Sequence, residues 1–275
     1  MTLFDDPAPP PTAPSGPSVR VRLQLAYDGR RFHGFASQPP GVRTVAGTLA
    51  GALERVLRLP GPLEITCAGR TDTGVHAWDQ WAHVDLPEAC GDALPSLHRR
   101  LVKLLAPEIV VRAVSVAPPG WDARRSALSR TYRYSVLTTP VPDPFRAGFV
   151  WWLPGPLDRR AMELACDALV GEHDFGSFCR KREGSSLVRR VARAGWCEPE
   201  PGMLRFEITA NAFCHQMVRS VVGTLVEVGQ GKRRAGDLLG VVRAGDRALA
   251  GTLAPPDGLV LWKVQYAESG VGRTT

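Results

Sequence analysis

The sequence predicts a mixed α+β protein built from two ferredoxin-like β-α-β-β-α-β units, which form one continuous mixed, largely antiparallel sheet with helices on one face. Strand-like and helix-like hydrophobic periods follow one another in this order, and the order occurs twice along the chain. The chain has 275 residues, enough for two modest domains, and 44% of them are hydrophobic. No apolar run approaches the roughly 18 residues that a membrane span requires.

The first half of the chain contains one set of these elements. In its first segment apolar side chains recur at every second residue, which is the period of a half-buried strand. In the second they recur at spacings of three and four after Thr44, whose hydroxyl can cap a helix. The expected elements are a strand at 19–27, a helix at 45–57, strands at 63–68 and 80–86, a helix at 93–105 and a strand at 109–116.

The second half repeats the order. Asp158 is expected to cap a helix that ends at Gly171 and whose buried stripe includes Leu164, and Asn211 is expected to open the next long helix. The expected elements are a strand at 131–137, a helix at 158–171, strands at 188–197 and 204–209, a helix at 211–229, a short helix after 234 and a strand at 259–266. The predicted organisation is a disordered proline-rich tail at 1–18, domains at 19–128 and 129–267, and a flexible C-terminus at 268–275.

Cysteine usage and charge bear on the compartment and the partner. The N-terminus lacks the pattern of a secretory signal, and the six cysteines contain no C-x-x-C pair, so we expect buried free thiols and a cytoplasmic protein without disulfides or a metal. The net charge is +7, and all but four of the 34 basic residues are arginine, which forks onto phosphate and stacks on bases. A nucleic-acid partner and an ordinary solvated, arginine-rich surface both fit this composition.

The most informative segment is Gly69-Arg70-Thr71-Asp72-Thr73-Gly74, between two expected strands. Its glycines can present the Asp72 carboxylate at a loop tip, and Arg70 can keep it ionised by Coulomb attraction. An ionised carboxylate in a cleft can act as a nucleophile. An ordinary turn is the alternative. An aspartic protease is a further one, but it needs a paired carboxylate and this chain has one D-T-G.

Further motifs flank this loop in a fixed order. They are Tyr27-Asp28-Gly29 with Gly34 and Gln38, Ala123-Arg124-Arg125-Ser126-Ala127, Tyr132-Arg133-Tyr134, Gly171-Glu172-His173-Asp174-Phe175-Gly176-Ser177-Phe178, and Asn211-Ala212-Phe213-Cys214-His215-Gln216-Met217-Val218-Arg219. With these motifs, which span about 19–267, the sequence resembles the TruA family of tRNA pseudouridine synthases. It departs from the family pattern at Phe35-Ala36-Ser37, in a loop where we expect RNA contacts, and at Thr73 and Ser220.

The resemblance implies the pseudouridine synthase fold and the isomerisation of uridine to pseudouridine in the anticodon stem-loop of tRNA, at uridines 38, 39 and 40. It also implies a homodimer that needs no cofactor and no metal. Asp72 would be the nucleophile, Tyr132 would pack on the target base, Arg70 would help to extrude that base and Arg219 would pair with Asp72.

Other residues carry weaker expectations. For His76 and His215, structural roles are favoured over general-base roles. A non-catalytic RNA-binding protein made of two ferredoxin-like units is the alternative function. RNA contacts are expected from Gln38, Arg124, Arg180, Lys181 and Arg182.

Overall fold

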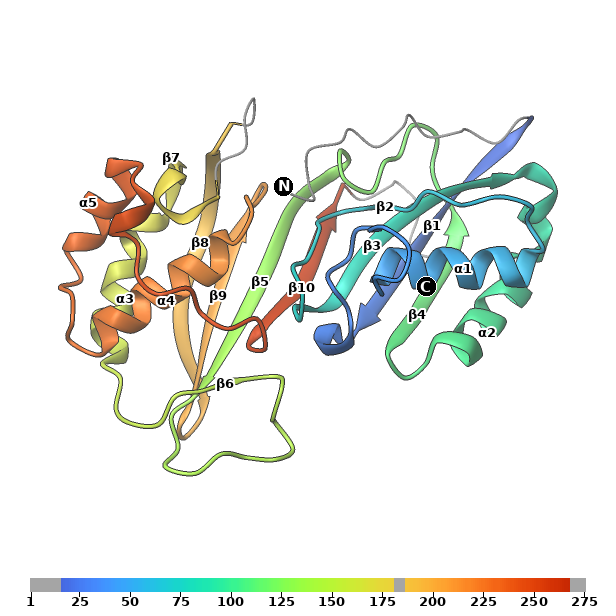
Figure 1. Ribbon diagram of the computed structural model, residues 1–275. Coiled ribbons are helices and arrows are strands. Elements are labelled where there is room, and N and C mark those ends of the chain that lie inside the picture. Colours follow the sequence, from blue (N-terminus) through green and yellow to red (C-terminus); the bar gives the residue numbers. More distant parts are fainter. Residues whose placement is uncertain (1–15, 181–185, 268–275) are drawn as a thin grey trace, which may run out of the picture.

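The computed structural model describes residues 16–180 and 186–267, apart from the side chain of Asp92 (Figure 1). Of the two predicted tails it describes only residues 16–18, and Ser18 already begins the first strand. The helices and strands are β1 (Ser18–Tyr27), α1 (Val45–Leu57), β2 (Thr66–Cys67), β3 (His76–Pro87), α2 (Leu94–Leu105), β4 (Ile109–Val116), β5 (Ala127–Leu137), β6 (Trp151–Trp152), α3 (Arg159–Cys166), β7 (Gly171–Asp174), β8 (Val188–Glu200), β9 (Met203–Ala210), α4 (Met217–Gly229), α5 (Asp237–Ala244) and β10 (Leu259–Tyr266).

All ten strands belong to one sheet, which confirms the predicted fold class. Its order is β4-β1-β3-β10-β5-β9-β8-β7, with β2 paired to β3 and β6 paired to β5. The order β4-β1-β3-β2 in the first half therefore recurs as β10-β5-β9-β8 in the second, as in two ferredoxin-like units. A short parallel pairing of β10 with β3, at His76 and Ala77, joins the two halves.

The junction between the halves positions the predicted loop. One edge of β3 is shared, since β2 pairs with it at Ala82 and His83 whereas β10 pairs with it at His76 and Ala77. The connection between β2 and β3, residues 68–75, therefore leaves the sheet where these two neighbours of β3 diverge. The Asp72 loop thus emerges at the centre of the molecule.

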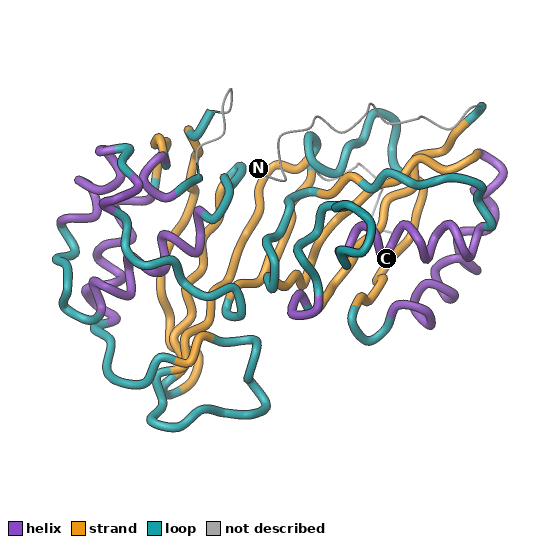
Figure 2. The backbone as a smooth tube through the Cα atoms, viewed as in Figure 1, coloured by secondary structure: helices purple, strands orange, loops and turns teal. Residues whose placement is uncertain are grey.

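The helices fall into two groups, one for each half of the sheet. Figure 2 shows α1 and α2 beside the first strands and α3, α4 and α5 beside the last ones. The hydroxyl of Thr44 accepts from the amide of Gly47 at 3.1 Å, so the predicted cap of α1 is confirmed. Asp158 caps α3 in the same way through the amide of Ala161. None of the helices in the described ranges is long and apolar enough to cross a membrane.

Several predicted boundaries are wrong for reasons of tertiary pairing. The strand expected at 63–68 shrinks to β2, while the strand expected from 80 starts at His76 because β10 pairs there. The short strands β6 and β7 were not predicted. In α3 the buried side is formed by Met162, Ala165 and Cys166, and Leu164 is 66% exposed, so its predicted place in the stripe is wrong.

The start of the last long helix differs most from the prediction. Asn211 does not open it, because its side-chain oxygen accepts from the amides of Arg190 and Ala212. The helix α4 begins at Met217 instead, after Gln216, whose φ is +64°. The segment from Asn211 to Gln216 is therefore a loop rather than a helical turn.

The cysteine prediction is also wrong. Cys179 and Cys214 form a disulfide, with their Cα atoms 5.8 Å apart, a separation that suits such a bond. The two residues are 35 positions apart, so only the tertiary fold brings them together. Cys67, Cys90, Cys166 and Cys197 are free, and Cys197 is exposed rather than buried.

Candidate active site

Buried polar side chains of the sheet bind the backbone and side chains of the Asp72 loop. The Gln80 side chain is fully buried and donates to the carbonyl of Gly69 at 2.7 Å. The hydroxyl of Tyr27 lies 2.8 Å from that of Thr71. The Arg130 guanidinium, itself buried, donates to the carbonyl of Ala68 at 2.8 Å. These bonds fix the first half of the loop, residues 68–71, to β1, β3 and β5.

Close backbone approach fixes the loop from the side of residues 29–35. A Cβ at Gly29 would overlap the carbonyl oxygen of Val75, and one at Gly34, where φ is +90°, would lie 2.8 Å from the carbonyl oxygen of Thr71. Phe35 is 1% exposed and its amide donates to the same Thr71 carbonyl at 3.1 Å. Phe35 therefore braces the Asp72 loop from inside, and the RNA contacts expected from its own loop would come from exposed neighbours such as Ser37 and Gln38.

Two side chains from one segment meet the Asp72 carboxylate, which is 26% exposed. His215 Nε2 lies 3.4 Å from Oδ1 and Arg219 Nη1 lies 3.9 Å from Oδ2, so each oxygen faces a different partner. The Arg219 side chain is 13% exposed, and its Nε donates to the carbonyl of Ala254 at 2.8 Å, which fixes its direction. The structure thus brings Arg219 to Asp72, as the resemblance implies.

Arg70 takes a different place from the one its position in the sequence suggested. Its side chain is exposed, and in the part of the chain that the structure describes no ion pair within 4 Å joins it to Asp72. The opposite charge nearest to the carboxylate comes from Arg219 instead. Coulomb attraction by Arg70 within this loop is therefore not the contact that holds Asp72.

Tyr132 lies beside the same loop, on β5. Its ring is 7% exposed and packs edge-on against Phe213, with ring centroids 4.9 Å apart. Its hydroxyl oxygen is 3.6 Å from the position that a Cβ on Gly69 would take. Burial and the negative charge of Asp72 both raise the pKa of Tyr132, so this hydroxyl stays protonated at neutral pH.

The two histidines in the motifs differ in their surroundings. His76 is 2% exposed; its Nδ1 accepts from the amide of Gly29 and its Nε2 donates to the carbonyl of Gly148. Burial lowers the pKa of His76, and this neutral, packed ring fits a structural role. His215 contacts Asp72 directly, and the sequence analysis did not predict this contact. No local pattern signalled this contact, because His215 lies in the loop before α4 and not on a helical face shared with Arg219.

The residues expected to bind RNA are spread over several elements. Gln38 is exposed and donates to the carbonyl of His33, Arg124 is exposed beside Asp122, and Arg180 is exposed at the rim of a cavity described below. Lys181 and Arg182 lie outside the described residues. Within the described ranges no group of three or more His, Cys, Asp or Glu residues is placed to hold a metal ion.

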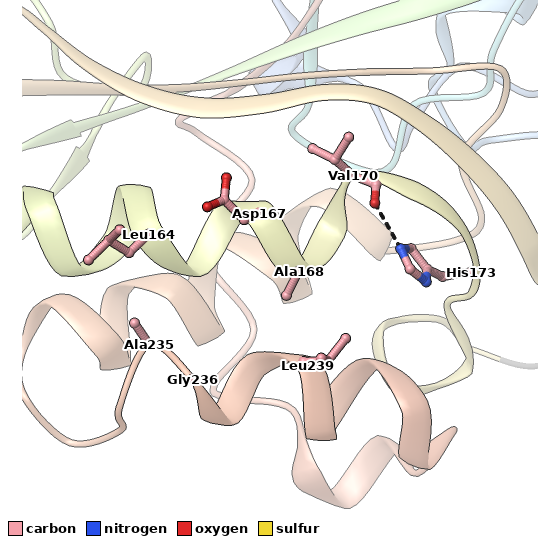
Figure 3. Close-up of a pocket in the computed structure, with 8 residues that line it drawn as sticks. All are labelled: Leu164, Asp167, Ala168, Val170, His173, Ala235, Gly236 and Leu239. Atoms are coloured by element: carbon pink, nitrogen blue, oxygen red, sulfur yellow. Dashed lines mark hydrogen bonds between the residues drawn. The ribbon is translucent and has the colours of Figure 1, made fainter.

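A separate groove lies between α3 and α5 (Figure 3). Its lining includes Leu164, Ala168 and Leu239, and His173 at its end donates to the carbonyl of Val170 at 3.0 Å. None of the residues that meet at Asp72 lines this groove. This groove is therefore separate from the cluster of side chains around Asp72.

Comparison with known proteins finds relatives that match nearly the whole chain. A family model described as tRNA pseudouridine synthase matches residues 165–267. A protein from Frankia casuarinae named tRNA pseudouridine synthase A is 46% identical over 249 residues, covering 90% of this chain and 89% of its own. Proteins of the same name from Leifsonia xyli and Streptomyces griseus are 40% and 43% identical, covering 93% and 90% of this chain and 95% and 88% of their own.

Solved structures are more distant. A chain of the structure titled "Crystal Structure of a Cbf5-Nop10-Gar1 Complex" aligns with a TM-score of 0.34 and 15% identity, covering 88% of this chain and 48% of that chain. This likeness is too low to carry an argument. The identities to curated relatives are high and extend over nearly the whole chain, so this chain belongs to the tRNA pseudouridine synthase family.

Proposed function

We propose that this protein isomerises uridine to pseudouridine in the anticodon stem-loop of tRNA, with Asp72 as the nucleophile. The observation that carries the proposal is the placement of Asp72: a partly exposed carboxylate on a rigid loop, with His215 at one oxygen and Arg219 at the other. The relatives named tRNA pseudouridine synthase A support the substrate class. By family resemblance the targets are uridines 38, 39 and 40.

The reaction requires a transient covalent bond from the Asp72 carboxylate to the target nucleotide. The glycosidic bond between N1 of uracil and the ribose breaks, the uracil turns, and a carbon–carbon bond forms between C5 and the same ribose carbon. The bond between Asp72 and the nucleotide breaks in the same sequence and releases the carboxylate. The proton on C5 is then lost and N1 gains one, so atoms balance without an added reactant. Arg219 offsets the charge of the carboxylate before and after the covalent step, and His215 orients the other oxygen.

The nucleotide must leave its stack before Asp72 can reach it, which costs a few kcal/mol. Arg70 belongs to the same loop as Asp72 and is exposed, which supports a role in occupying the position of the extruded base. Tyr132 lies beside the loop, where its ring can pack against the base once the site opens. Gln38, Arg124, Arg180, Lys181 and Arg182 would contact the surrounding RNA.

Release of tritium from C5 tests the catalytic proposal. Transfer RNA labelled with tritium at C5 of uridine should lose label with the wild type and retain it with Asp72→Asn, which preserves size but removes the charge. Thr73→Ser, a change at an exposed neighbour, is the matched control and should retain activity. Turnover by Asp72→Asn would exclude Asp72 as the nucleophile. A wild type that binds tRNA but forms no pseudouridine would favour the non-catalytic RNA-binding alternative.

The assembly and the compartment are part of the same proposal. The family resemblance suggests a homodimer that acts in the cytoplasm, where tRNA is modified. Light scattering should give twice the monomer mass for the purified chain. Pseudouridine mapping of tRNA from cells with and without the gene should reveal losses confined to positions 38, 39 and 40.

A further inference from the structure

A second cavity lies behind the segment that carries His215. It has a volume of about 540 Å³, within the range of sites for small organic ligands and large enough for one nucleotide. It is lined in part by Gly176, Arg180, Gln216 and Arg247, from elements of the second half of the chain. It shares no side chain with the contacts around Asp72.

Positive charge dominates the walls of this cavity. Arg180 and Arg247 both line it, and within residues 16–180 and 186–267 no carboxylate lies within 4 Å of either guanidinium. The acidic residue in the lining is Asp174, whose Oδ1 accepts from the amide of Gly176 at 2.8 Å. Partial burial lowers the pKa of Arg247, as expected where no nearby anion offsets the lost hydration.

Arg247 is also held in place. Its Nη1 donates to Ser220 Oγ at 2.7 Å, and Ser220 is fully buried in α4. That helix begins beside the cavity, after Gln216, with no side-chain cap, so the positive end of its dipole lies close by. The guanidinium is therefore an ordered cation at the wall of an open cavity.

The cavity adjoins the catalytic centre through one residue. The amide of Arg180 donates to the carbonyl of His215 at 3.3 Å, while the ring of the same His215 lies 3.4 Å from Asp72. When a uridine of the substrate RNA reaches Asp72, the RNA chain continues on both sides of that uridine, and one side passes His215. The surface that it meets behind His215 is the one lined by Arg180 and Arg247.

We propose that this cavity is a subsite for the sugar-phosphate backbone of the substrate RNA next to the reacting uridine, with Arg180 and Arg247 binding its phosphate. This inference rests on the proposed function for the identity of the substrate. It adds a binding site for one particular part of that substrate, and it assigns Arg247, which the sequence reading had not singled out. Arginine suits this role because its planar fork matches two phosphate oxygens.

Binding as a function of salt tests the subsite. A fluorescent, unmodified tRNA anticodon stem-loop is titrated with the wild type, Arg180→Gln and Arg247→Gln at several salt concentrations. Each variant should bind about tenfold more weakly, and the slope of log affinity against log salt should fall by about 0.7 to 0.9 for each lost phosphate contact. Arg247→Lys should recover part of the affinity. Arg99→Gln, at an exposed site on α2, is the control and should bind like the wild type.

A further control separates binding from disruption of α4. Ser220→Ala removes the hydrogen bond that orders Arg247 but keeps its charge, so affinity should fall less than in Arg247→Gln and the salt slope should stay that of the wild type. The single-turnover rate at saturating RNA should change less than twofold in the Arg180→Gln and Arg247→Gln variants. Unchanged affinity and salt slope in both variants would overturn the subsite, as would lost turnover with unchanged binding. A wild type without turnover would refute the proposed function instead, and binding would still test the subsite.

Discussion

The contact between Arg219 and Asp72 gives the sharpest quantitative prediction. At the 3.9 Å between Nη1 and Oδ2, two unit charges attract with about 4 kcal/mol at an effective dielectric constant of about 20. This figure is an upper bound, because Asp72 is 26% exposed and water screens part of the attraction. The attraction favours the step in which the carboxylate is released and regains its charge, so we expect Arg219→Ala to raise the barrier of that step by about 2 to 3 kcal/mol, which is roughly a 30- to 150-fold loss of rate.

The loss should appear in the chemical step and not in binding. Arg219 is 13% exposed and is directed by its bond to the Ala254 carbonyl, so it faces the carboxylate rather than the solvent where RNA arrives. Single-turnover tritium release at saturating tRNA measures the rate, and the fluorescent stem-loop measures the affinity. Arg243→Ala, at an exposed arginine in the last turn of α5, is the matched control.

Two results would refute this reasoning. An equal loss of rate and of affinity in Arg219→Ala would mean that Arg219 contacts phosphate instead of Asp72. An unchanged rate would mean that the charge of Arg219 does not matter to the carboxylate. Arg219→Lys supplies the intermediate case, since it keeps the charge but cannot donate to Ala254 and reach Asp72 with the same rigid fork.

Two further predictions concern the support of the site and its dependence on pH. Gln80→Leu removes the donor to the Gly69 carbonyl, so it should lower the free energy of unfolding by about 1 to 3 kcal/mol, as measured by urea denaturation. The same variant should release tritium more slowly. Stability and activity equal to those of the wild type would show that this bond does not hold the loop. Burial lowers the pKa of His76 and of His83 in the folded protein, whereas a histidine in the unfolded chain has a pKa of about 6.5. Just below pH 6.5 the unfolded chain therefore binds more protons than the folded protein. The melting temperature should therefore fall between pH 7.5 and 5.5, while exposed carboxylates are still ionised, and a melting temperature that stayed level or rose would contradict this reading.

The alternation and capping signals located most elements because they act locally. Thr44 caps α1, Asp158 caps α3, and β4 and β10 have the bounds that the hydrophobic pattern predicted. The Asp72 motif was found for a related reason, since a short polar run between glycines stands out from the strands on either side. These features depend on a few consecutive residues, so a single sequence carries them.

Errors arose where a distant partner decided the local structure. Asn211 has the side chain of a helix cap, but the amide of Arg190 on β8 competes for its oxygen, and α4 begins at Met217. The loop that results places His215 against Asp72 and Cys214 against Cys179, two contacts that no local pattern specifies. Leu164 satisfied a helical stripe and is nevertheless exposed, because the neighbouring strands meet the other side of α3.

The sequence by itself therefore determined the family, the order of the elements and the choice of Asp72 as the proposed nucleophile. Tertiary structure decided what surrounds that residue: Arg219 and His215 rather than Arg70, with Gln80 and Arg130 beneath the loop. The physical reason is the separation along the sequence over which each kind of interaction acts. Backbone propensities and caps act over a few residues, whereas the partners of a carboxylate are set by how β3, β10 and α4 pack together from opposite ends of the sequence.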